Sequence, residues 1–213
     1  MKSLLLLLAL VAVARADALP HEGPCGDVDA CEAACKKNKP GTCFYGGVLV
    51  LQTVKEDRDP RAQKLFDRAC TKGDGEACWQ SARIVDRNDT AEGTTRAKTR
   101  TAYQKACTRN HARACFAYAQ TFERAEDPKS KKLAVDAQKK GLSLLEQRCV
   151  KSKLAPACDW ASNLYAGTSW QPQNPKKAED LHQRSCKIRM GAACPPPPPP
   201  PAPAMTKQAT RPD

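Results

Sequence analysis

The sequence has 213 residues, twelve of them cysteine, and carries 35 Lys and Arg against 23 Asp and Glu, for a formal net charge of +12. This length corresponds to one or two domains. The basic excess favours acidic partners, and an even cysteine count in an exported chain favours disulfides over redox-active thiols or zinc.

Residues 1–16 are predicted to be a secretory signal peptide cut after Ala16. A lysine precedes ten apolar residues, Leu4 to Val13, and the small-x-small triplet Ala14-Arg15-Ala16 follows. This apolar run is too short to span a membrane as a helix, and no later segment is long enough. No cysteine follows the cut directly, so a lipoprotein anchor is not expected. We expect a secreted or periplasmic protein that neither spans a membrane nor binds nucleic acid.

A short N-terminal segment, 17–26, is followed by a repeat region, 27–194. The repeat is marked by cysteines spaced C-x7-C, with one pair a residue wider, and alanine precedes four of the five second cysteines. The pairs are Cys35 and Cys43, Cys70 and Cys78, Cys107 and Cys115, Cys149 and Cys158, and Cys186 and Cys194. Recurrence at steps of 35 to 42 residues indicates a repeat architecture.

A first helix is predicted before each first cysteine. In the second unit the apolar residues recur with helical spacing on one face that ends at Cys70: Ala62, Leu65, Phe66 and Ala69. Three of these helices begin with a capping residue followed by proline: Asp59-Pro60, Asp127-Pro128 and Asn174-Pro175. The first helix of the fourth unit is about two turns longer than the others.

A second helix is predicted after the second cysteine in the first four units. Its fourth position after that cysteine is always small (Gly47, Ala82, Ala119, Ser162), as a close helix crossing requires. In the first unit, Phe44 to Val54 is rich in β-branched residues and alone could form a strand. Register with the other units makes us favour a helix there.

In such a unit the two cysteines face each other across the turn between the helices. A disulfide closing so short a loop removes roughly 2.5 kcal/mol of unfolded-state entropy. Zinc knuckles of the C-x2-C type do not occur, so we expect structural disulfides and no metal site. Cys25 and Cys31 lie outside the scheme: they pair with each other most simply, but Cys31 could exchange roles with Cys35, and Cys25 could bridge two molecules.

These features resemble the Sel1-like repeat, a tetratricopeptide-like helix pair, in its cysteine-rich secreted form, the Helicobacter cysteine-rich protein family. The runs AQKLFDRACTKGDGEAC (62–78), TAYQKACTRNHARAC (101–115) and KKAEDLHQRSCKIRMGAAC (176–194) carry the resemblance, together with ASNLYAG (161–167). A mitochondrial cytochrome oxidase assembly factor has related repeats. The resemblance implies an α-solenoid, and it also implies a possible penicillin-binding or weakly β-lactam-hydrolysing activity.

The residues themselves give catalysis little support. Besides His21, the histidines are His182, interpreted as a core or interface residue because it occupies the slot of Phe66, and His111, expected to be exposed in a turn. The familiar catalytic motifs of β-lactamases, metalloproteases and α/β-hydrolases are absent. We therefore assign no catalytic residue and no cofactor.

Aromatic and basic residues are the remaining candidates for contact with a partner. Tyr118 and Tyr165 are interpreted as core residues, whereas Trp170, in an inter-repeat loop, is the better candidate for contact; Trp79 and Trp160 could line a groove. Lysine pairs occur at Lys36-Lys37, Lys131-Lys132, Lys139-Lys140 and Lys176-Lys177, and the simplest interpretation is a solvated helix surface.

The chain ends in a proline-rich tail, 195–213, predicted to be disordered, with seven consecutive prolines that prevent a second helix in the last unit. The sequence thus predicts an all-α solenoid of four helix pairs and a half-unit, each stapled by a disulfide. The expected function is a monomeric binding scaffold for another protein or an anionic envelope polymer, and the alternative is a β-lactam hydrolase.

Overall fold

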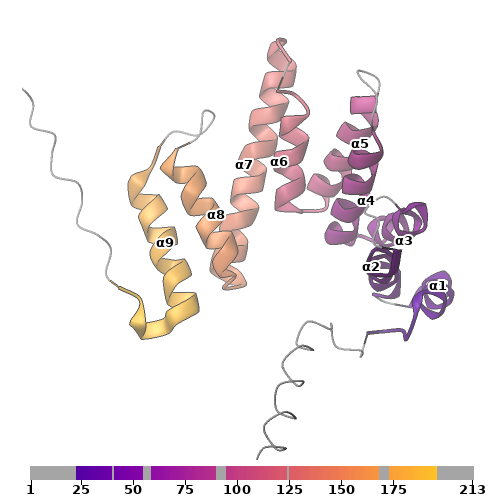
Figure 1. Cartoon of the computed structure of the whole chain (residues 1–213). Helices are drawn as coiled ribbons and strands as arrows, with labels where there is room; N and C mark the ends of the chain where they lie inside the picture. The colour runs from indigo at the N-terminus through magenta and orange to yellow at the C-terminus, as the bar shows by residue number, and fades with distance from the viewer. Residues whose placement is uncertain are drawn as a thin grey trace, which may run out of the picture. The chain divides into compact units, whose positions relative to one another are not determined.

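A computed structural model describes residues 23–39, 41–54, 59–89, 95–123, 125–167 and 173–195 (Figure 1). These residues form helices α1 to α9 and the one-turn 3-10 helix η1, and they contain no strand. The all-α prediction is confirmed, including the first repeat, where Thr42–Val54 is helix. The predicted signal peptide (1–16) and almost all of the proline-rich tail lie outside the described residues.

The chain divides into two compact units between Ala137 and Gln138. In the first unit each helix from α1 to α6 packs against the next, in antiparallel pairs. The helices are α1 (Val28–Lys36), α2 (Thr42–Val54), α3 (Pro60–Thr71), α4 (Gly75–Asn88), α5 (Thr95–Thr108) and α6 (Ala112–Gln120), followed by the beginning of α7.

The second unit contains the rest of α7 (Pro128–Lys151), which is the longest described helix, as the sequence predicted. It continues with α8 (Ala155–Ala166), α9 (Pro175–Met190) and η1 (Gly191–Ala193). Helices α8 and α9 lie against each other along their length. The last repeat is a half-unit among the described residues, because only η1 follows α9 before the prolines begin.

The predicted helix starts are capped as expected. The Asp59 carboxylate accepts hydrogen bonds from the backbone N–H groups of Arg61 and Ala62. Asp127 accepts from the Ser130 N–H at 2.8 Å, and Asn174 accepts from the Lys177 N–H at 3.0 Å. The hydrogen bond from Ser130 stabilises the ionised carboxylate and lowers the pKa of Asp127 below its ordinary value.

The turn between paired helices repeats a feature that we did not identify in the sequence. The third residue after the first cysteine has a positive φ in the first three pairs: Asn38 at 60°, Gly73 at 100° and Asn110 at 62°. Asparagine and glycine are the residues that tolerate this conformation, which ends a helix. The next N–H then donates back to the carbonyl before the first cysteine, as from Asp74 to Ala69 at 3.3 Å. The spacing of the cysteines therefore follows from a three-residue helix-ending turn.

The small residues of the second helices sit at close helix crossings. Gly47, Ala82, Ala119 and Ser162 are all buried. A Cβ atom built on Gly47 would lie 2.7 Å from Cε1 of Phe66, so α2 and α3 approach too closely for any side chain there. The Ser162 hydroxyl donates to the Ala178 carbonyl of α9 at 2.7 Å. The first compact unit also has an aromatic core built around Tyr103, Tyr118 and Phe122, which pack with Ala82, Ala119 and Ala137.

Candidate functional site: stapled helices and their grooves

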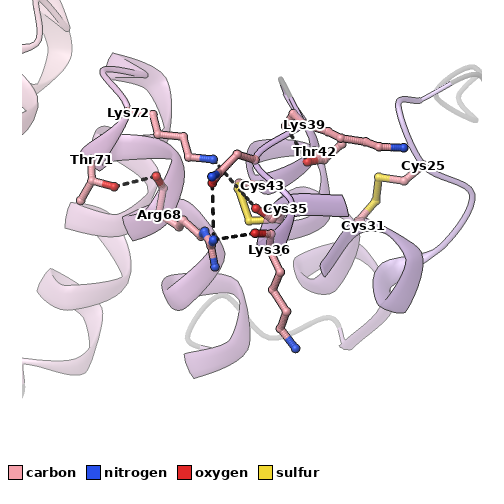
Figure 2. The surroundings of a disulfide bond; sticks show 11 residues. Cys25, Cys31, Cys35, Lys36, Lys39, Thr42, Cys43, Arg68, Thr71 and Lys72 are labelled. Atoms are coloured by element: carbon pink, nitrogen blue, oxygen red, sulfur yellow. Dashed lines mark hydrogen bonds between the residues drawn. A yellow bond between two sulfur atoms is a disulfide. The ribbon is translucent and has the colours of Figure 1, made fainter. Parts of the chain in front are cut away.

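All twelve cysteines form disulfides in the structure. The bonds join Cys25 to Cys31, Cys35 to Cys43, Cys70 to Cys78, Cys107 to Cys115, Cys149 to Cys158 and Cys186 to Cys194. Their Cα–Cα distances of 4.5 to 5.5 Å lie in the usual range for disulfides. Cys25 is bonded to Cys31, the simplest of the arrangements considered, and this bond ties the segment before α1 to the helix itself (Figure 2).

The surroundings of the Cys35–Cys43 staple show how one pair is held to the next. Arg68 of α3 donates to the Lys36 carbonyl at 3.0 Å and to the Asn38 side chain at 3.4 Å, at the end of α1 (Figure 2). The ammonium group of Lys72 lies 4.0 Å from the sulfur of Cys43. The contact from Arg68 caps the end of α1 with a cation, which the helix dipole favours.

A groove of about 490 Å³ lies beside this staple in the first unit, and we name it the α1–α3 groove. Cys35 and Lys36 line it from α1, and Arg61, Lys64 and Leu65 from α3. Two of its four cations, Arg61 and Arg68, are engaged within the protein. Arg61 forms ion pairs with Asp29 and Glu32, and these hydrogen bonds raise the pKa of the guanidinium above its ordinary value.

A larger groove, of about 990 Å³, lies in the second unit, and we name it the α7–α9 groove. The end of α7 contributes Cys149 and Val150, and the following turn contributes Lys153. Most of the side chains from α9 follow helical spacing: Lys176, Lys177, Asp180, Leu181, Gln183, Arg184, Lys187 and Ile188. In both grooves the walls are first helices of neighbouring repeats, and one wall ends at a stapled cysteine.

A partly exposed network of side chains holds the helices around the α7–α9 groove. Glu146 of α7 accepts a hydrogen bond from the Tyr165 hydroxyl of α8 at 2.7 Å and pairs with the Lys177 ammonium of α9 at 2.6 Å. The ammonium group of Lys177 also lies 4.6 Å from the centre of the Tyr165 ring. The bond to Glu146 raises the pKa of Lys177 above its ordinary value. Burial raises the pKa of Tyr165, which therefore stays protonated.

The two histidines among the described residues contradict the sequence interpretation. His111, expected to be exposed, is 3% exposed and is the N-cap of α6. Its Nδ1 accepts from the Ala114 N–H at 3.3 Å, its Nε2 lies 2.9 Å from the carboxylate of Glu76, and its ring stacks on Trp79 at 5.2 Å. The contact with His111 lowers the pKa of Glu76. Because Glu76 and Trp79 belong to α4, His111 links the α3–α4 pair to the α5–α6 pair.

His182, expected in the core or an interface, is exposed. The equivalent position, four residues before the first cysteine, is occupied by Phe66 in the second repeat and by Tyr103 in the third repeat, and both are buried. Helices α3 and α5 are each followed by a full second helix, whereas α9 is followed by η1 alone in the described part of the chain. We attribute the exposure to this half-unit, because no second helix among the described residues covers that side of α9.

The remaining candidates fall into three groups. Tyr118 and Tyr165 are buried, which confirms their interpretation as core residues. Trp79 and Trp160 are half-buried. His21 and Trp170 lie outside the described residues.

Within the described residues, no group of three or more His, Cys, Asp or Glu side chains gathers as a metal ion would require. No helix in this part of the chain is long and apolar enough to cross a membrane. Comparison of the sequence with protein-family models and with curated proteins gave no match.

Proposed function

We propose that the chain is a secreted or periplasmic Sel1-like repeat protein that acts as a binding scaffold. It recognises its partner through a preformed surface and makes or breaks no covalent bond. The partner is another protein or an anionic envelope polymer, and the scaffold works as a monomer. The Sel1-like assignment rests on the repeated cysteine-bearing motifs, and paired helices with a disulfide in each pair are consistent with it.

One observation carries the proposal. Each of the two compact units has an open groove with a stapled cysteine in its wall, Cys35 in the first and Cys149 in the second. Each staple joins one wall of a groove to the second helix of its pair (α1 to α2, α7 to α8), and that second helix packs on the other wall (α3, α9), so the groove is largely formed before a partner arrives. A surface that needs no ordering on binding loses less conformational entropy when it binds. The staples thus have a direct role in recognition.

The exported location is supported by the cysteine chemistry. Six disulfides indicate an oxidising compartment outside the cytoplasm. The predicted signal peptide, 1–16, agrees with that location. Secretion and residence in a periplasm both satisfy these observations.

The test is affinity capture with the oxidised protein immobilised, using envelope and culture-medium fractions of the source organism. Reduced and alkylated protein is the matched control, because it has the same sequence and charge but no staples. We expect a partner retained by the oxidised protein alone and bound saturably in calorimetry. Equal retention by both forms would contradict a stapled surface. Nitrocefin hydrolysis that survives repurification would instead support the β-lactam hydrolase alternative.

A further inference from the structure

We propose that the α7–α9 groove binds an acidic peptide segment of a partner protein. Carboxylates of the peptide meet the basic rim of the groove, and an apolar side chain of the peptide covers its floor. This inference rests on the scaffold function proposed above and names the chemistry of the partner. It is carried by the charges and the exposed apolar surface of the groove.

Four of the five cations that line the α7–α9 groove have no carboxylate partner among the described residues, and the fifth, Lys177, pairs with Glu146. Lys176, Arg184 and Lys187 lie on one face of α9, and Lys153 faces them from the turn after α7. Among the described residues, none of these four cations forms an ion pair with a carboxylate. Asp180 is the one carboxylate in the lining. Positive charge of this density, held on ordered helices, attracts a segment that brings several carboxylates.

The α1–α3 groove differs in this respect. Arg61 is paired with Asp29 and Glu32, and Arg68 donates to the carbonyl at the end of α1. Two cations of its lining, Lys36 and Lys64, have no carboxylate partner among the described residues, against four in the α7–α9 groove, and a peptide carboxylate that reached Arg61 would have to displace a partner that the protein already supplies. The unpaired charge therefore points to the α7–α9 groove.

The floor of the α7–α9 groove distinguishes a peptide from an anionic polymer. Leu181 and Ile188 of α9 and Cys149 and Val150 of α7 line it. Leu181 and Cys149 are buried, so the exposed apolar surface comes from Val150, which is 50% exposed, and from the half-buried Ile188. Covering apolar surface of this kind is favourable, at about 25 cal/mol per Å². A sulfated or phosphorylated polymer has anions but no apolar side chain to place there. A protein segment has both, so the groove fits an acidic peptide with interspersed leucine, isoleucine or phenylalanine.

The experiment uses the oxidised full-length protein and a short, fluorescein-labelled peptide rich in glutamate with interspersed leucines. Three comparison probes separate the contributions: the same peptide with glutamine for glutamate, the same peptide with serine for leucine, and labelled dextran sulfate. Binding is measured by fluorescence anisotropy at several NaCl concentrations. The Debye screening length falls from about 30 Å at 0.01 M to about 10 Å at 0.1 M salt, so the charge contribution to binding should weaken over this range.

Two variant pairs test the location. Lys176→Glu/Lys187→Glu reverses two rim charges, and Lys131→Glu/Lys139→Glu makes the same change in net charge at exposed positions of α7 that do not line the groove. Val150→Ser removes apolar surface from the floor. Val54→Ser is its control, because Val54 is 46% exposed at the end of α2. Circular dichroism and denaturation midpoints establish that each variant folds.

We expect the glutamate–leucine peptide to bind saturably and more tightly than either substituted peptide. The rim pair should weaken binding by about tenfold or more, and Val150→Ser by about threefold, while both controls change it by less than about twofold. Equal losses in the rim pair and its control would overturn the proposal, because they would indicate only a long-range charge effect. Tight binding of dextran sulfate with no effect of Val150→Ser would establish an anionic-polymer site instead and would also overturn it.

Absence of saturable peptide binding would overturn the groove assignment directly. The capture assay then separates this failure from failure of the scaffold function. If the rim pair retains the captured partner as well as the unaltered protein does, the groove is wrong and the scaffold function stands. If the unaltered oxidised protein captures nothing beyond the reduced control, the scaffold function itself fails.

Discussion

Removing one interior staple tests how much the disulfides stabilise the helix pairs. In Cys70→Ala/Cys78→Ala both sulfurs are lost, so no free thiol remains to form another bond. The two cysteines are eight residues apart in sequence, and a loop of that length corresponds to about 2.5 kcal/mol of unfolded-state entropy at 25 °C. Both side chains are at most 2% exposed, so the lost sulfurs also leave a small cavity. We expect a total loss of about 2.5 to 4 kcal/mol.

The terminal staple provides a matched comparison, because Cys186 and Cys194 are also eight residues apart. Without it, η1 can detach while α9 stays packed on α8, so the folded state gains freedom much as the unfolded state does. We therefore expect Cys186→Ala/Cys194→Ala to cost less than about 1 kcal/mol, although the loop-entropy term is the same.

Urea denaturation followed by circular dichroism at equilibrium measures both changes. With a slope of about 2 kcal/mol per M, the interior variant should lower the midpoint by about 1 M or more, and the terminal variant by less than about 0.5 M. Coincidence of near- and far-ultraviolet transitions checks that each is two-state. A loss below about 1 kcal/mol for the interior pair, or equal losses for the two pairs, would refute this reasoning.

Three further predictions concern the contacts between helices. His111→Ala should cost about 2 kcal/mol, because it removes the cap of α6 and a buried ring, while His111→Asn keeps a capping side chain and should recover about 1 kcal/mol in the same urea titrations. The pKa of Glu76 is lowered in the folded state, so the stability that its carboxylate contributes is present above the unfolded pKa of about 4.3 and is lost as pH falls through the folded pKa. The stability difference between the unaltered protein and Glu76→Gln should therefore shrink to zero in acid. A difference that does not change with pH would contradict the pairing with His111. Because nearly half of the Glu76 side chain is exposed (46%), that difference stays below about 1 kcal/mol at neutral pH. Gly47→Ala should destabilise the protein by about 1 to 3 kcal/mol, although alanine has the higher helix propensity, because the added Cβ would collide with Phe66. Thermal melting measures this change, and a rise in melting temperature would rule out the close crossing.

The sequence was informative wherever the determinant is local. Capping residues followed by proline place the starts of α3, α7 and α9, and a small residue marks the close crossing in each second helix. The register of the repeat was strong enough to override the β-branched composition of Phe44 to Val54. The helix-ending turns were also encoded locally, in Asn38, Gly73 and Asn110, and could have been recognised from their common place three residues after a cysteine.

The two histidines show where local pattern fails. His111 is buried because Glu76 and Trp79 of the preceding pair lie against it, and nothing in its own turn specifies those partners. His182 has the right periodicity for a core residue but belongs to a unit in which the structure describes no second helix. Burial of a repeat position depends on its neighbours in space, which the periodicity of a single helix does not contain.

The sequence by itself determined the helix pairs, their lengths and the spacing of the cysteines, because these follow from capping, turn and periodicity signals within a few residues. Only the tertiary structure decided which charges find partners. Arg61 and Lys177 are neutralised by carboxylates of neighbouring helices, whereas Lys176 and Lys187, in equally basic stretches, face an open groove. Ion pairing depends on distances between side chains that are far apart in the sequence, and packing of the helices sets those distances.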